Sequence, residues 1–142
     1  MNNIMKDQIL RVFSDDPWDG GYWMSGKDGW GERKTFNKNG HIETRIFYKS
    51  GARDGECKIW YKNGQIETIC YYKNGDKEGS FTSWYDNGQL YILCSYKNDY
   101  QDGEYKQWNA DGTLERHGWA KHGHNVADFL EYPELKKEYD IK

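Results

Sequence analysis

The sequence predicts an all-β protein, a single-layer antiparallel β-meander of tandem 24-residue hairpin repeats with short N- and C-terminal caps. Two observations lead to this fold class. Glycines recur every 24 residues in separate rows along the chain, and self-similarity at such a period is the signature of a repeat architecture. Asn-Gly pairs stand between short runs rich in Ile, Tyr, Trp and Thr, which is the strongest short-range signal for a β-hairpin.

The repeats run through residues 31–123 without an insertion, and we divide them into the units 31–54, 55–78, 79–102 and 103–123. Two glycine rows and one aromatic row define the units. These rows are Gly31, Gly55, Gly79 and Gly103; Gly40, Gly64, Gly88 and Gly112; and Phe36, Trp60, Trp84 and Trp108. We expect these residues to be structural, because Gly allows tight turns and the aromatic row supplies apolar surface.

Each unit needs two turns, and the stretch YKNGQIETICYYKNGDKEG at residues 61–79 contains both. The first Lys-Asn-Gly closes a hairpin, and the second joins that hairpin to the next one. Gly64 and Gly75 accept the positive φ that such turns require. Each repeat therefore adds two strands, or about 9.6 Å, to one growing sheet.

Two pairing registers remain open for the hairpin. A two-residue loop places Cys57 opposite Cys70, whereas a three-residue loop with Gly64 in a bulge places Trp60 opposite Ile66. We favour the second register, because it gathers the most regular apolar rows on one side of the sheet. That side would hold Trp60, Ile66, Cys70 and Tyr72, and the other side Cys57, Ile59, Tyr61, Glu67, Ile69 and Tyr71.

The two flanks differ from the repeats, as terminal units of repeat arrays commonly do. Residues 1–30 are interpreted as an N-terminal cap, in which WDGGYWMSGKDGWGE at 18–32 resembles a degenerate half-repeat. Residues 124–142 are interpreted as a partly helical C-terminal cap. Val126, Phe129 and Leu130 have near-helical spacing, and Pro133 is suited to start a helical turn.

The unit GExxxWYxNGQIExxxYYKNGxxxG resembles the MORN repeat (membrane occupation and recognition nexus) in its bacterial variant, over residues 31–123. Departures from the pattern are Asn37, Ser80, Asp99 and Asn109. The resemblance implies a twisted sheet of stacked hairpins that acts as a scaffold or binding surface without catalysis. Contact with phospholipids has been proposed for some members, and members of the bacterial variant are often labelled antitoxins or immunity proteins.

The composition argues against several function classes. A net charge of −3 and a pI near 5.8 argue against nucleic-acid binding, which needs a basic face. No apolar run is long enough to span a bilayer, and MNNIMKDQILRVF at 1–13 lacks the apolar region of a signal peptide. Three cysteines without metal-ligand spacing fit a reducing compartment. We therefore expect a soluble, cytoplasmic protein.

No motif for catalysis or for a cofactor is found. The chain contains no nucleophile elbow, P-loop or dinucleotide fingerprint. His117, His122, His124 and Cys94 do not have the spacing of a metal site. We expect a protein that is not an enzyme and that binds neither a cofactor nor a metal.

The aromatic side chains, 17% of all residues, are the best candidates for binding a partner. A one-layer sheet has two faces, which the short flanks cannot both cover, and Tyr and Trp anchor protein interfaces at little entropic cost. The alternative is that the aromatic rows only stabilise the sheet. The candidate partner-binding residues are Tyr61, Phe81, Tyr85, Tyr105, Tyr71, Tyr91 and Glu67.

Rows of acidic residues repeat beside the aromatic ones, and this combination suits a basic protein partner. The rows are Glu32, Glu56 and Glu104, and Glu43, Glu67 and Glu115. Our hypothesis is an antitoxin or immunity protein that neutralises a cognate bacterial toxin by direct binding. The alternative is a scaffold or a peripheral-membrane adaptor.

A lysine row also repeats with the period, but acids in the same turns compensate its charge, which disfavours a membrane surface. The row consists of Lys49, Lys73, Lys97 and Lys121. An unpaired terminal strand is able to join a second copy of the chain, so a homodimer through the sheet edge is a further expectation.

Overall fold

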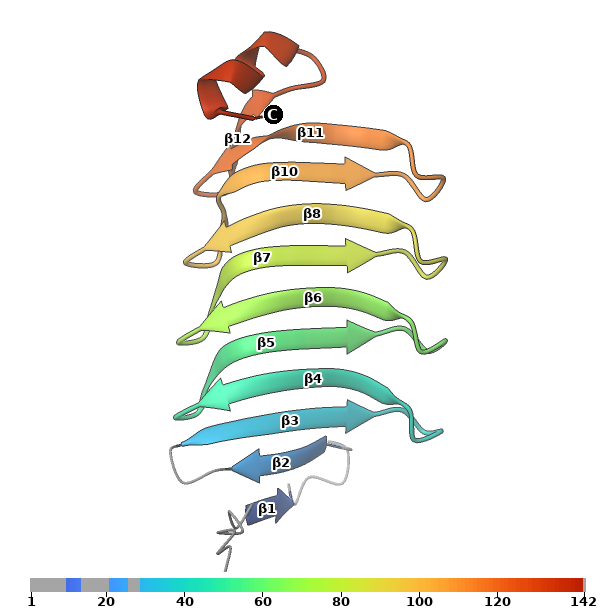
Figure 1. Cartoon of the computed structure of the whole chain (residues 1–142). Helices are drawn as coiled ribbons and strands as arrows, with labels where there is room; N and C mark the ends of the chain where they lie inside the picture. The colour runs from blue at the N-terminus through green and yellow to red at the C-terminus, as the bar shows by residue number, and fades with distance from the viewer. Residues whose placement is uncertain (1–9, 14–20, 26–28, 142) are drawn as a thin grey trace, which may run out of the picture.

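The computed structural model describes residues 10–13, 21–25 and 29–141. In that part of the chain all strands belong to one antiparallel sheet, in which they follow one another in chain order except for the two-residue strand β9, which pairs with β8 off this path (Figure 1). The sheet is a single-layer meander, as predicted. Its strands are β1 (Leu10–Phe13), β2 (Gly21–Ser25), β3 (Trp30–Phe36), β4 (Ile42–Lys49), β5 (Ala52–Trp60), β6 (Ile66–Lys73), β7 (Asp76–Trp84), β8 (Leu90–Lys97), β9 (Tyr100–Gln101), β10 (Gly103–Trp108), β11 (Leu114–Lys121) and β12 (His124–Asp128).

The turns alternate between the two long sides of the sheet (Figure 1). The hairpin-closing turns follow β3, β5, β7 and β10, and the connecting turns follow β4, β6, β8 and β11. Strands β5 and β7 begin at Ala52 and Asp76, so Gly55 and Gly79 lie inside strands rather than at their starts. The glycine that opens each unit in the sequence is therefore a strand residue.

Within the proposed N-terminal cap, β1 pairs with β2 and β2 pairs with β3. Residues 1–9, 14–20 and 26–28 of that cap lie outside the described residues. Among the described strands, β1 and β12 are the two edges of the sheet. Pairing of a second copy at either edge stays a prediction.

Both turns of a repeat contain residues with positive φ, but the two turns have different geometries. In the hairpin-closing turn Gly64 has φ of +85° and its N–H donates to the carbonyl of Tyr61 at 2.9 Å. In the connecting turn Asn74 and Gly75 have φ of +50° and +99°, the pair of values that a type I′ turn needs. Asp99 takes the place of that glycine one repeat later at φ of +65°, and its carboxylate accepts a hydrogen bond from the N–H of Lys77 at 2.7 Å.

The hairpin register combines the two alternatives that the sequence left open. Next to the turn Trp60 lies opposite Ile66, as in the favoured register. A β-bulge between Ile59 and Trp60 then shifts the pairing by one residue, so that Cys57 lies opposite Cys70. The favoured register was therefore wrong beyond the turn, because a bulge accommodates one extra residue on the return strand. The same shift occurs in the hairpins β3–β4, β7–β8 and β10–β11.

The bulge also overturns the predicted division of side chains between the two faces. Successive residues of a strand point to opposite faces, so Cys70 and Tyr72 share a face with Cys57. Trp60 and Ile66 lie on the other face. The rule of alternation holds on each side of the bulge, but not across it.

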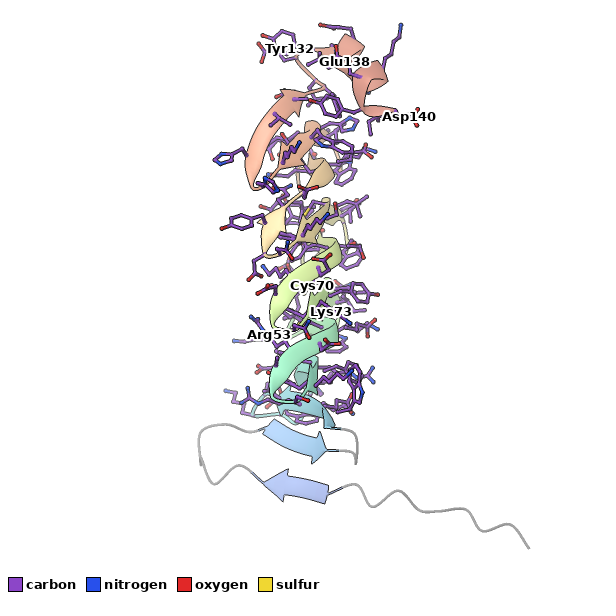
Figure 2. All side chains as sticks on the ribbon, turned by 90° about the vertical axis from the view of Figure 1, so that its left-hand side faces the viewer. Arg53, Cys70, Lys73, Tyr132, Glu138 and Asp140 are labelled. Atoms are coloured by element: carbon purple, nitrogen blue, oxygen red, sulfur yellow. The ribbon has the colours of Figure 1, made fainter. Side chains whose placement is uncertain are left out.

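Most buried side chains gather on the face that contains Cys57 and Cys70, which we call the inner face. The bulges bend the strands, and Figure 2 shows the sheet from its side as one curled layer. Large residues oppose small ones there, since Phe81 pairs with Cys94 and Tyr105 with Gly118. The buried residues of this face are Cys57, Thr68, Cys70, Ser83, Cys94, Tyr105 and Ala120.

Near the C-terminus, the segment after β12 covers part of the opposite, outer face. After β12, the chain places the fully buried Phe129 against the ring of His117, with ring centroids 5.0 Å apart. The 3-10 helix η1 (Pro133–Tyr139) follows and brings Tyr139 to 5.1 Å from the ring of Trp119. Residues 124–128 form a strand, so the near-helical spacing of Val126 and Phe129 does not mark a helix. No helix of the described residues is long and apolar enough to cross a membrane.

Candidate functional site

The structure brings most of the predicted binding residues to the inner face, beside the hairpin-closing turns. Tyr61, Glu67, Phe81 and Tyr91 line one depression there. The ring of Tyr85 lies 4.9 Å from that of Tyr91. Tyr105 lies on the same face one repeat further along, but it is buried. Tyr71 is separate from the others, because its pairing with Glu56 places it on the outer face, where it is 39% exposed.

The depression at Tyr61 is part of a longer hollow along the turn side of the inner face, which we call the turn-edge groove. It has three compartments of about 490, 620 and 400 Å³, in the first, second and third repeats. The first and second compartments share Glu43 and Lys62, and the second and third share Tyr61 and Glu67. The compartments therefore follow one another along the sheet, across the strands.

The two acidic rows seen in the sequence differ in their surroundings. The row on the outer face is neutralised by its neighbours. Glu32 is paired with Arg45 and with Lys34 at 3.1 Å, and Glu56 with Lys58 at 2.9 Å. Glu104 completes the row, with the Nζ of Lys106 at 2.8 Å and the Nε2 of His117 at 2.7 Å.

These ion pairs lower the pKa of two of the outer carboxyl groups. Burial by itself would raise the pKa of Glu32, but hydrogen bonds and positive charge from Arg45 and Lys34 outweigh it and lower the pKa. The pKa of Glu104 is lowered in the same way against the effect of burial, by Lys106 and His117. The outer row therefore offers little free negative charge to a partner.

The acids of the turn-edge groove differ from those of the outer row in their contacts. In the part of the chain that the structure describes, the carboxylates of Glu43, Glu67 and Asp86 form no ion pair. The pKa of Tyr61 reflects this environment, because burial first, and then the charges of Glu67 and Asp86, raise it. A groove with unpaired carboxylates and aromatic walls is suited to hold cationic side chains.

Tyr61 and Tyr85 also have a structural role. The hydroxyl of Tyr61 donates to the carbonyl of Trp84 at 2.7 Å, and that of Tyr85 to the carbonyl of Trp108 at 2.9 Å. The side-chain amide of Asn63 donates to the carbonyl of Asp86 at 3.0 Å. The hairpin-closing turns after β5 and β7 are therefore each tied to the turn of the next repeat.

Reasoning from the sequence missed Asp86 and Lys62 as groove residues. They occupy equivalent positions just before the Asn-Gly of successive repeats, where the sequence reads Lys38, Lys62, Asp86 and Ala110. The signal that could have revealed Asp86 is the change from a lysine, in the first two repeats, to an acid in the third. A search for identical residues at the 24-residue period overlooks such a position, because its residue type is not the same in all repeats.

The three cysteines are buried and unlinked. Cys57 and Cys70 lie directly opposite each other, and a hydrogen bond between the two thiols raises the pKa of Cys57 and lowers that of Cys70 to about 7. Cys94 pairs with Phe81 on the inner face, whereas His117 lies on the outer face. Among the described residues no group of three or more His, Cys, Asp or Glu side chains is placed to hold a metal ion.

Comparison with known families adds one finding. A family model described as MORN repeat variant matches residues 31–50, 53–74 and 77–98. The matched segments coincide with the hairpins β3–β4, β5–β6 and β7–β8, whose turn ends form the groove. No curated protein matches the chain.

Proposed function

Since the chain is a MORN repeat protein, we propose that it is a protein-binding module whose turn-edge groove holds a basic partner. MORN repeats are typically modules for interaction with proteins or membranes. The proposal rests chiefly on one observation, the unpaired carboxylates of Glu43 and Glu67 beside aromatic side chains in the groove. A cationic side chain that entered the groove would gain ion pairs and aromatic contact without displacing an existing ion pair.

We further propose that the partner is a cognate bacterial toxin, which this chain neutralises as an antitoxin or immunity protein. A toxin that acts on nucleic acid needs Lys and Arg side chains to contact phosphates, and an acidic aromatic groove is complementary to such a surface. Covering that surface would block the toxin without any catalysis by the MORN chain. The cytoplasmic location expected from the sequence is part of this proposal.

Co-expression tests the toxin proposal. A gene beside that of this chain should arrest growth when expressed alone and be tolerated when expressed together with the chain, and the two proteins should co-purify. Neighbouring genes that are all harmless alone and yield no co-purifying product would exclude the antitoxin role.

Groove variants test whether the groove is the binding surface. We expect the double variant Glu43→Gln, Glu67→Gln to weaken capture of the partner about tenfold or more, with a reduced dependence on salt. The matched control is Glu134→Gln, Glu138→Gln in η1, which removes the same charge from exposed positions far from the groove. Equal capture by the groove variant and the control would show that the groove is not the interface.

A second function, as a peripheral-membrane adaptor, is favoured by one observation. The side chains of Lys49, Lys73, Lys97 and Lys121 are all exposed along the side of the connecting turns, which faces the viewer in Figure 2 near Lys73. Sedimentation with anionic liposomes at low salt tests this function. Binding that is lost on changing these lysines to Gln would support it, and no binding would exclude it.

A further inference from the structure

We infer that the turn-edge groove takes an extended segment of the partner in the polyproline II conformation, with basic side chains three residues apart. This inference rests on the proposed function and specifies what the groove recognises. It comes from the spacing of the groove compartments, from the direction of the groove relative to the strands, and from the positions of its unpaired acids.

The compartments repeat with the sheet itself. Glu43 stands between the first and second compartments, and Glu67, its equivalent one repeat later, between the second and third. One repeat is one hairpin, so these positions are two strands apart. Two strand spacings correspond to about 9.6 Å. A partner that uses both acids must present cationic groups at this interval.

The interval distinguishes the regular conformations that a peptide can adopt. Same-side residues of a β-strand are about 6.6 Å apart, which is too short for one repeat. In an α-helix, a residue returns to the same face after seven positions, or about 10.5 Å. A polyproline II helix returns after three residues, or about 9.3 Å. The period of the polyproline II helix is the closest to the length of one repeat. A difference between the two periods adds up from one compartment to the next, so the closest match is favoured when several compartments are filled together.

The direction of the groove also favours this conformation. The groove crosses strands whose neighbours are hydrogen-bonded on both sides, because β5 pairs with β4 and β6, and β7 with β6 and β8. No free strand edge is exposed there for the addition of another strand. The segment must therefore bind through its side chains, and a polyproline II helix is stiff, lacks internal hydrogen bonds and is commonly bound in aromatic-lined grooves.

The charges indicate where the basic side chains would lie. Asp86 adds a third carboxylate to the second compartment, whose lining has one lysine, Lys62, and the third compartment has Glu67 with no lysine in its lining. The first compartment has Lys38 and Lys62 beside Glu43, which disfavours a further cation in that compartment, beyond Glu43. We therefore place one basic residue near Glu67 and Asp86, whose charges both act on Tyr61, and the next, three positions away, near Glu43 in the second compartment. Arg suits both places, because it stacks on aromatic rings and pairs with carboxylates.

Synthetic peptides test this inference with the full chain. The probe is a nine-residue peptide of Pro and Arg with Arg at every third position, and the control has the same residues with its Arg contiguous. A third peptide is a longer, Ala-rich helix that has the same number of Arg residues, seven positions apart. We expect the periodic peptide to bind about tenfold more tightly than either control in fluorescence anisotropy. This preference should disappear in Glu67→Gln and persist in Glu134→Gln.

Equal affinity for the periodic and contiguous peptides, or tighter binding of the helical one, would overturn the inference. So would a preference that survives in Glu67→Gln, because the peptide would then lie elsewhere. These failures are distinguishable from failure of the proposed function. If the Glu43→Gln, Glu67→Gln variant still loses the protein partner, the groove is the interface and only the polyproline II geometry is wrong. If that variant keeps the partner, the proposed function itself fails.

Discussion

The hydroxyl of Tyr61 donates a hydrogen bond to the backbone carbonyl of Trp84, 2.7 Å away and one repeat further along the chain. The same relationship links Tyr85 to Trp108 in the next repeat. A tyrosine ring at this position therefore forms the wall of the groove while its hydroxyl holds two repeats together. The two roles belong to different atoms, so that substitutions can separate them.

Removing only the hydroxyl should affect stability. In Tyr61→Phe the carbonyl of Trp84 loses its donor while the ring stays, and we expect a loss of about 1 kcal/mol in the free energy of unfolding. Denaturant titration measures this loss. Tyr91→Phe is the control, since Tyr91 lies in the same groove and is 37% exposed. An unchanged midpoint in Tyr61→Phe would show that the bond contributes nothing to stability.

The hairpin-closing turn should not tolerate a β-branched residue. Gly64 has φ of +85°, and a Cβ added there would meet no atom within 4 Å. Gly64→Val therefore tests backbone strain alone, and we expect it to destabilise the protein by about 1–3 kcal/mol. Gly64→Asn should cost less, because Asn tolerates the left-handed region. Equal melting temperatures for the Val and Asn variants would contradict this account.

The sequence predicts those features of the fold that single residues determine, and not those that depend on contacts between strands. The turns at Gly64 and Gly75 were predictable, because positive φ is a property of single residues. The register beyond the turn was not, since the bulge between Ile59 and Trp60 leaves no mark in the residue types. The pairing of Glu32 and Glu56 was also hidden: in the sequence they look like Glu43 and Glu67, and only the fold shows which acids have cationic neighbours.

Position 118 should not tolerate a side chain larger than that of glycine, although Gly118 belongs to neither of the repeating glycine rows. A Cβ at this position would lie 2.2 Å from the carbonyl oxygen of Ala127 and 2.7 Å from the hydroxyl of Tyr105. We expect Gly118→Ala to cost about 1–3 kcal/mol by overpacking. Replacing the neighbouring ring in the double variant Gly118→Ala, Tyr105→Leu should not restore stability, because the added Cβ would still clash with the carbonyl oxygen of Ala127. Chemical denaturation of the three proteins measures the effect, and a neutral Gly118→Ala would refute it.

The facing cysteines should form a specific cross-link under oxidation. Opposite residues of an antiparallel pair have Cα atoms about 4.5–5.5 Å apart, which is within the range of a disulfide. We expect diamide to oxidise the two thiols of Cys57 and Cys70 to a disulfide, while Cys94, which faces Phe81, stays reduced. Peptide mapping by mass spectrometry identifies the link. A link through Cys94 in the folded protein would contradict the register.

Acid should weaken the fold through the paired carboxylates of the outer face. The pKa of Glu32 in the folded protein is lowered from its ordinary value of 4.5, so the unfolded chain binds more protons in the interval between the two values. The stabilisation is therefore complete above about pH 4.5 and is lost as the pH falls through the lowered pKa. Glu104 acts with the same sign.

We expect Glu32→Gln to be less stable than the parent at neutral pH, and the difference to shrink in acid. Denaturant midpoints measured from about pH 7 to about pH 3 test this, with Glu67→Gln as the unpaired control. A difference between Glu32→Gln and the parent that stays constant across this range would show that the ion pairs with Arg45 and Lys34 do not stabilise the fold.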